Sequence, residues 1–152
     1  MRAHSIRELF RDRLQDALLA AAVAAVLSGI PSTAWALVTG GDPLQAARAA
    51  GNILLPATAP PALLLAAGSV AHVLISIGWA IVLSWFLPER RTVAVAILAG
   101  AAIAALDLGI LGRSFPLITE LDTAPQLADH LAYGAITGAV IARRRAARRA
   151  RR

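Results

Sequence analysis

The chain has 152 residues, of which 58% are hydrophobic and 16% are charged, and its formal net charge is +6. A soluble domain of this length has fewer apolar and more charged residues, and here the apolar residues form long blocks with the charges between them. This composition predicts a polytopic membrane protein without a separate soluble domain. The chain contains no cysteine and no lysine, which excludes disulfides, thiolate metal sites, cysteine nucleophiles and lysine Schiff bases.

The beginning of the chain has the pattern of an amphipathic helix. Ser5-Ile6-Arg7-Glu8 has the spacing of a capping box, in which the side chains of the first and fourth residues bond to backbone N–H groups at a helix start. Leu9, Phe10 and Leu14 share one helical face with Ile6, and the neighbouring arginines lie largely off that face. We expect a short helix on the membrane surface that leads into the first span.

Four segments are long and apolar enough to cross the roughly 30 Å hydrocarbon core of a bilayer. They lie at about 17–39, 62–87, 92–112 and 125–142. The fourth is the shortest and has Asp129 and His130 near its start, so we expect it to insert as a hairpin with the third. The sequence therefore predicts an all-α fold, a four-helix transmembrane bundle within a single integral membrane domain over residues 1–152.

The arginines predict how the spans are oriented. Thirteen of the fifteen precede the first span, lie between the second and third, or follow the fourth; only Arg48 and Arg113 fall on the other side. Because arginine-rich short segments stay in the cytoplasm, both termini are predicted to be cytoplasmic. Abundant alanine and arginine are typical of GC-rich bacterial genomes, so we expect a multi-pass protein of a bacterial inner membrane.

A cleaved signal peptide is an alternative for the first span. The stretch "STAWA" at 32–36 follows an apolar run and ends in the A-x-A pattern of a cleavage site after Ala36. Against cleavage, Glu8, Asp12 and Asp16 lie in the region that would have to be basic, and the apolar run continues through Val38. Both possibilities leave the orientation of the other spans unchanged.

Pro31 interrupts the first span within "SGIPST" at 28–33. Proline removes a backbone hydrogen bond and kinks a helix, and nearby hydroxyl groups can bond to the freed carbonyls. The interruption predicts either a simple kink near the outer surface or a broken helix that lines a binding site.

Two further helix starts are predicted on the outer side. Asp42 has the chemistry of an N-cap followed by Pro43, and Gly51 or Asn52 can end the short helix that they open. Thr123 and Gln126, the latter within the fourth span, have capping-box spacing at the start of that span.

Small residues predict where helices approach closely. The fourth span contains Gly134 and Gly138 in a GxxxG pattern, and the third contains Gly100 and Ala104 at the same spacing. Such pairs let helix backbones come together. The contact could be within the bundle or between subunits, so a homo-oligomer or another membrane protein partner is possible.

Ionisable side chains within the spans are the candidate functional residues, because they are costly in lipid. They are His72, Asp107, Asp129 and His130. His72 lies roughly 15 Å from the outer end of the second span, near the midplane, and the others lie in the outer half. Arg113 follows Asp107 closely enough to reach back to it. These five residues are predicted to form one polar cluster, which either fixes the helix register or carries a function.

Three kinds of function are compatible with this cluster. The first, which the sequence favours, is a non-enzymatic accessory or assembly subunit without cofactor, metal or catalytic residue. The second is a small proton- or ion-linked carrier or channel, in which Asp107 titrates and His72 relays the proton. The third comprises a haem-binding protein that uses His72 and His130 and a lipid-modifying enzyme, although no catalytic or ligand-spacing motif supports either.

The basic tail at 143–152 follows the fourth span directly. Its position predicts a stop-transfer anchor that binds the anionic headgroups of the lipid bilayer, and no nucleic acid. The arginines assigned to this role are Arg143, Arg144, Arg145, Arg148 and Arg149.

Overall fold

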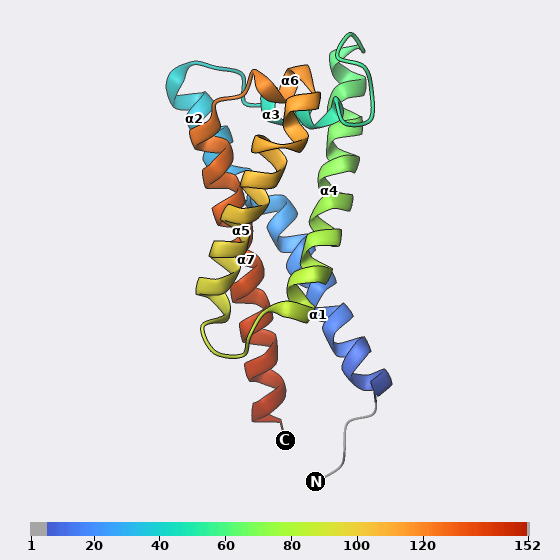
Figure 1. Cartoon of the computed structure of the whole chain (residues 1–152), viewed down its shortest axis with the longest axis vertical. Helices are drawn as coiled ribbons and strands as arrows, with labels where there is room; N and C mark the ends of the chain where they lie inside the picture. Colours follow the sequence, from blue (N-terminus) through green and yellow to red (C-terminus); the bar gives the residue numbers. More distant parts are fainter. Residues whose placement is uncertain (1–5, 152) are drawn as a thin grey trace.

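The computed structural model describes residues 6–151, which form helices joined by short loops and contain no strand (Figure 1). The predicted all-helical fold is confirmed. The helices are α1 (Ile6–Leu27), α2 (Ile30–Thr39), α3 (Gln45–Gly51), α4 (Pro61–Phe86), α5 (Thr92–Gly109), the 3-10 helix η1 (Leu111–Ser114), α6 (Pro116–Thr119) and α7 (Thr123–Ala150). The predicted capping box depends on Ser5, which lies outside the described residues.

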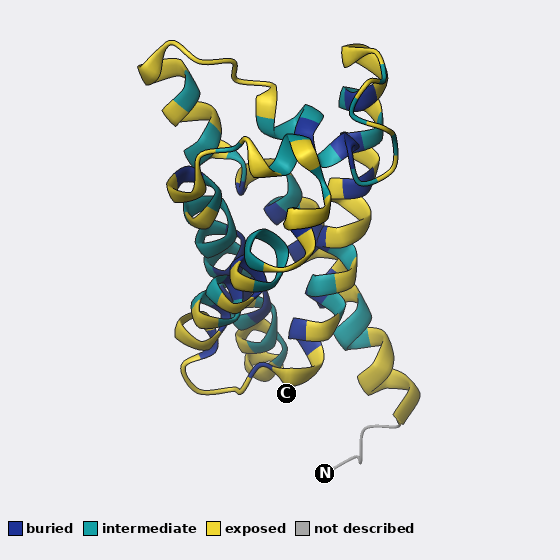
Figure 2. Ribbon diagram, turned by 45° about the horizontal axis from the view of Figure 1, so that its top comes forward, coloured by how far each residue is buried: buried dark blue, intermediate teal, exposed yellow. Residues whose placement is uncertain are grey.

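Three helical stretches in the described part of the chain are long and apolar enough to cross a membrane: Ile6–Thr39, Pro61–Phe86 and Thr92–Ser114. Their faces also suit lipid, because large apolar side chains such as Val26, Leu74 and Leu98 are exposed. Figure 2 shows exposed residues over much of the outward helix surface, with buried residues along the helix contacts. These features are those of a multi-pass membrane protein.

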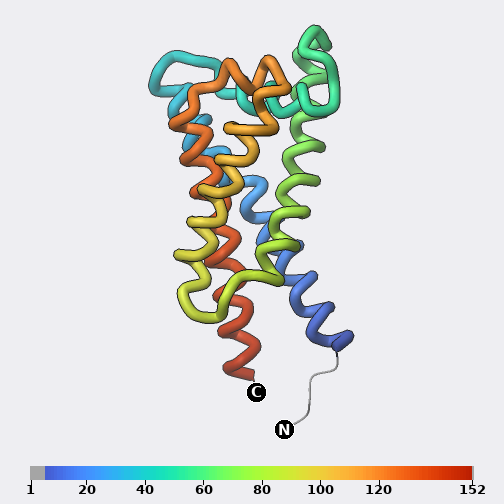
Figure 3. Tube along the Cα trace, viewed as in Figure 1, coloured from blue at the N-terminus to red at the C-terminus, as the bar shows by residue number. Residues whose placement is uncertain are grey.

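The four long helices α1, α4, α5 and α7 run side by side, and successive ones point in opposite directions (Figure 3). One end of the bundle, here called the arginine-rich end, holds residues 6–16, 87–91 and 143–151. The opposite end holds α2, α3, η1, α6 and the loops between them, and it is here called the cavity end because a cavity lies among these elements. The predicted fourth span lies within α7, which continues as a helix through the basic tail to Ala150.

Glycines and alanines join α5 to α7, and the contact predicted from small residues lies within the chain. A Cβ atom added at Gly100 would lie 2.3 Å from the carbonyl oxygen of His130, and one at Gly134 would lie 2.2 Å from that of Ala96. Gly138 faces the same stretch of α5, and Ala104 is buried. The two backbones therefore touch, which no larger side chain would allow.

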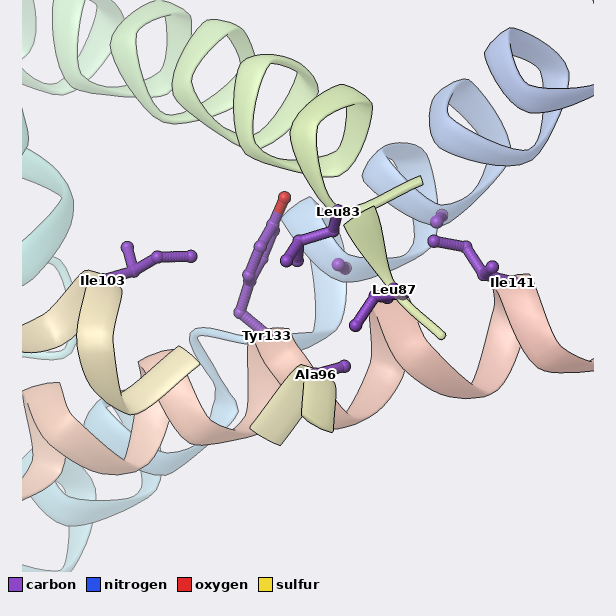
Figure 4. Close-up of a cluster of buried hydrophobic side chains, with 8 residues drawn as sticks. Leu83, Leu87, Ala96, Ile103, Tyr133 and Ile141 are labelled. Carbon is purple, nitrogen blue, oxygen red and sulfur yellow. The ribbon is translucent and has the colours of Figure 1, made fainter. Parts of the chain in front are cut away.

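The main apolar core lies between this pair, α4 and α1, and it includes Ala20 and Ala24 of α1. It contains Leu83, Leu87, Ala96, Ile103, Tyr133 and Ile141 (Figure 4). The ring of Tyr133 extends from α7 toward α4, where its hydroxyl group donates a hydrogen bond to the backbone carbonyl of Ser76.

The first span is interrupted just before Pro31, as the sequence predicted. Helix α1 ends at Leu27, and α2 begins at Ile30 with Gly29 as its N-cap and Pro31 in its first turn. Proline is tolerated there because the first turn of a helix has no intrahelical partner for its N–H groups.

The predicted caps are only partly correct. Helix α3 ends at Gly51 with Asn52 as C-cap, but its N-cap is Leu44; the Asp42 carboxylate instead accepts a hydrogen bond from the Leu44 backbone N–H at 2.9 Å. The capping box at Thr123 is wrong, because α7 already includes Thr123 and its N-cap is Asp122.

Candidate functional site

A cavity of about 690 Å³ lies in the cavity-end half of the bundle. Its walls come from the α1–α2 break, α3, α4, the end of α5 with η1, and the first turns of α7. Most lining residues are small or apolar, among them Ala25, Val73, Trp79, Ile103 and Phe115. A volume of this size and a mostly apolar wall with a few polar groups are typical of small-molecule binding sites.

The structure brings four of the five predicted cluster residues to this cavity. His72 from α4, Asp107 from α5, and Asp129 and His130 from α7 all line it. Arg113 does not: it is exposed in η1, and the described residues contain no hydrogen bond or ion pair between Arg113 and Asp107. Because α5 ends at Gly109, Arg113 no longer follows Asp107 along one helix.

His130 connects Asp107 to α7. Its Nε2 atom lies 3.3 Å from Oδ2 of Asp107, and its Nδ1 atom lies 2.8 Å from the backbone carbonyl oxygen of Gln126. A carbonyl oxygen only accepts hydrogen bonds, so Nδ1 must carry a proton. A second proton is then needed between Nε2 and the carboxylate, because otherwise two acceptors would face each other.

The His130–Asp107 pair is positioned by the close packing of its two helices. Because Gly100 has no side chain, α5 can lie directly against the backbone of His130. The same contact that joins the helices therefore sets the separation of the imidazole from the carboxylate.

Asp129 stabilises the beginning of α2. Its Oδ1 atom accepts a hydrogen bond at 2.9 Å from the backbone N–H of Ser32, in the first turn of that helix. The N-cap residue of α2 is Gly29, which has no side chain to bond to these N–H groups. The carboxylate from α7 thus takes the role that an N-cap Asp normally has, and it also benefits from the positive end of the helix dipole.

His72 stabilises the end of α1, on the other side of the same break. Its Nε2 atom lies 3.0 Å from the carbonyl oxygen of Ala25, to which it must donate. The last four carbonyl groups of a helix lack intrahelical partners. Of these, the carbonyl of Ala24 accepts from the backbone N–H of Ser28 at 2.8 Å, and that of Ala25 accepts from His72. Asp129 and His72 therefore stabilise the two helix ends on either side of the break, next to the cavity.

A second polar cluster, which the sequence did not reveal, lies at the arginine-rich end. Asp16 of α1 is 1% exposed and accepts hydrogen bonds from two arginines of α7. Arg144 donates from Nε at 3.1 Å, and Arg148 donates from both terminal nitrogens. This hydrogen bonding raises the pKa of Arg148 above its usual range. The i, i+4 spacing of these two arginines is the only signal of the cluster in the sequence.

The remaining tail arginines differ in their surroundings. Arg145 donates to the backbone carbonyls of Ser84 and Leu87, both at 3.0 Å, and burial lowers its pKa. Arg149 pairs with Glu89 at 2.9 Å, and Arg143 is exposed. Four of the five arginines assigned to lipid headgroups thus have partners within the chain, and binding of headgroups by this tail stays a prediction.

Within residues 6–151, no group of three or more His, Asp or Glu side chains is arranged to hold a metal ion. The metal- or haem-binding alternative through His72 and His130 stays a prediction. Comparison with protein families, with curated proteins and with solved structures finds no match for this chain.

Proposed function

We propose that this protein is a four-span membrane protein of a bacterial inner membrane with both termini in the cytoplasm. Its cavity, in the outer half, binds a small and largely apolar ligand, as the site of a carrier does. The single observation that favours a carrier over an accessory subunit is the cavity itself, because a subunit that only fills space or bridges partners needs no internal volume of about 690 Å³.

The packing of α7 supports the proposal that this helix crosses the membrane as the fourth span. It lies against α5 and α1, so its small residues are covered by protein and not by lipid. Asp129 and His130, which lower the hydropathy of this helix, face the cavity and have polar partners there. Polar groups in a spanning helix are tolerated when they face a cavity or the bundle interior.

The absence of cysteine makes the topology directly testable. We would introduce single cysteines at three exposed positions, Thr58, Glu120 and Ala147, and label intact cells with a membrane-impermeant maleimide. Four spans with cytoplasmic ends predict labelling of Thr58→Cys and Glu120→Cys from outside, and of Ala147→Cys only after permeabilisation. Labelling of Ala147→Cys together with Glu120→Cys from outside would show that α7 does not cross.

Ligand binding can be tested by filling the cavity. Ser69 of α4 lines it and is exposed, so Ser69→Trp adds volume without displacing a buried core side chain. The matched control is Leu74→Trp on the same helix, where the native side chain is 62% exposed outside the cavity. The probes are tetraphenylphosphonium, tetraphenylborate and neutral triphenylphosphine oxide, measured by calorimetry on the full chain in lipid nanodiscs.

We expect at least one probe to bind, and Ser69→Trp but not Leu74→Trp to weaken it by about tenfold or more, which is about 1.4 kcal/mol. Native mass spectrometry of gently extracted protein should also detect a bound small molecule. If no probe binds, or if Ser69→Trp and Leu74→Trp affect binding equally, the carrier proposal is wrong. Recovery of a stable protein partner would then support an accessory subunit.

A further inference from the structure

The charges around the cavity favour ligands of one sign. Its lining contains the carboxylates of Asp107 and Asp129 and the imidazoles of His72 and His130, and none of its lining residues is an arginine. An anionic headgroup would therefore meet two carboxylates without any permanent positive charge to bind it. A cation would instead be attracted by both carboxylates and would meet no permanent positive charge.

The carboxylates of Asp107 and Asp129 can each accept more hydrogen bonds than the one described above. Asp129 uses Oδ1 for the backbone of Ser32, and Asp107 uses Oδ2 for His130. A carboxylate has about four acceptor positions, so each can still face a positive group. Trp79 and Phe115 line the same space, and aromatic rings attract a cation with an apolar body.

The proton held between His130 and Asp107 is the charge that can leave when a cation enters the cavity. Bringing a cation into a mostly apolar cavity beside a pair that still holds its proton would add net charge at a cost. Loss of that proton avoids the cost. The proton between Nε2 and Oδ2 leaves to solvent, and its bonding electrons stay on the protein. His130 then remains neutral with Nδ1–H bonded to the Gln126 carbonyl, and Asp107 remains an anion beside the cation.

Resting on the proposed function, we propose that the cavity binds a lipophilic cation in exchange for one proton from the His130–Asp107 pair. The other titratable groups that line the cavity are Asp129 and Tyr133 on α7 and His72 on α4. The lining residues of α1, α2, α3 and α6 include no titratable side chain. Asp129, His72 and Tyr133 each have a hydrogen bond to a backbone group. The proton between Nε2 of His130 and Asp107 instead joins two titratable side chains, so it can leave while every one of these backbone bonds stays intact.

The test uses tetraphenylphosphonium, which has a permanent charge and no exchangeable proton, so any proton released comes from the protein. Tetraphenylborate is its anionic counterpart of the same shape. Binding to the full chain in nanodiscs is measured by calorimetry in two buffers of different ionisation enthalpy, and the difference in heat gives the protons released. We expect close to one proton per cation, tetraphenylborate at least about tenfold weaker, and affinity for the cation rising about tenfold per pH unit while the pair is still protonated.

Asp107→Asn is the diagnostic variant, because its amide can donate to Nε2 of His130 and so replaces the shared proton without changing the packing. It should abolish proton release and weaken tetraphenylphosphonium binding by about tenfold or more. The control is Asp42→Asn, which changes an exposed carboxylate of the outer loop that does not line the cavity. It should change neither the proton release nor the affinity for tetraphenylphosphonium.

The outcomes separate the two proposals. Equal binding of the cation and the anion, cation binding without proton release, or proton release that persists in Asp107→Asn would each overturn the exchange. If Ser69→Trp still blocks binding in these cases, the ligand-binding cavity itself stands. Failure of Ser69→Trp to affect any probe would instead refute the proposed function.

Discussion

Replacing Asp16 by alanine removes a buried carboxylate that joins α1 to the end of α7. In the native structure Asp16 is 1% exposed, and its two oxygens accept hydrogen bonds from Arg144 and Arg148. Removing one partner of a buried ion pair costs about 3–5 kcal/mol, because the remaining charge stays unpaired. Here the arginine side chains are 40% and 27% exposed and can regain water, and Arg148 keeps a second carboxylate, Asp12, at 3.7 Å. We therefore expect about 3 kcal/mol, the lower end of that range.

Thermal unfolding of the detergent-solubilised chain measures this loss. For a chain of this size each kcal/mol lowers Tm by about 2–4 °C, so Asp16→Ala should lower it by about 6–12 °C. The raised pKa of Arg148 contributes stability that is fully present below the ordinary arginine pKa and is lost only as the pH rises through the raised value. The difference between variant and native protein should therefore stay constant between about pH 7 and pH 9.

Glu89→Ala is the matched control at the same end of the bundle. Glu89 pairs with Arg149, but the two side chains are 75% and 59% exposed, and such surface pairs contribute about 0–1 kcal/mol. Asp16→Ala combined with Arg148→Ala should lose less than the sum of the two single changes, because each already breaks the same interaction. A loss in Asp16→Ala no larger than in Glu89→Ala would refute the assignment of Asp16 as a buried anchor.

The helix contacts and caps give three more expectations. Gly134→Leu should lower Tm strongly, because its side chain would meet the Ala96 backbone, whereas Gly78→Ala, where a Cβ meets nothing within 4 Å, should be neutral or stabilising by up to about 1 kcal/mol. Asp129→Ala should cost about 1 kcal/mol and speed hydrogen exchange in the first turn of α2. His72→Ala should cost about 1 kcal/mol, seen as faster exchange at the end of α1; an unchanged exchange rate in either variant would contradict its capping role.

The sequence predicted the helices well because their signals are local. Hydropathy over about twenty residues placed the apolar helices, and Pro31 located the interruption to within a few residues. Depth along each span was enough to expect Asp107, Asp129 and His130 at one level. The predicted caps were less reliable, since several residues near a helix start have suitable side chains and tertiary contacts decide which one is used.

The errors concern contacts between distant parts of the chain. Arg113 was expected beside Asp107, but the end of α5 at Gly109 separates them. The partners of Asp16 lie more than 120 positions away in sequence, and no local pattern in α1 indicates them. The hydrogen bonds from Asp129 and His72 to the α1–α2 break likewise require knowledge of which helices are neighbours.

The break at Ser28–Gly29 is also where the chain passes from one half of the bundle to the other. Before it, α1 packs on α4, which also holds α3; after it, α2 packs on α7, which is joined to α5 (Figure 1). The two halves meet through α1 and α7, with Asp16 between these helices, and again at the cavity end through α3 and α6, where the backbone N–H of Leu117 donates to Asn52. The cavity lies between the two halves. The chain therefore crosses between the halves at a break whose two helix ends are each held by a side chain from another helix, His72 of α4 on the α1 side and Asp129 of α7 on the α2 side. Displacing either side chain to make room for a ligand would leave a backbone group at the break without its partner.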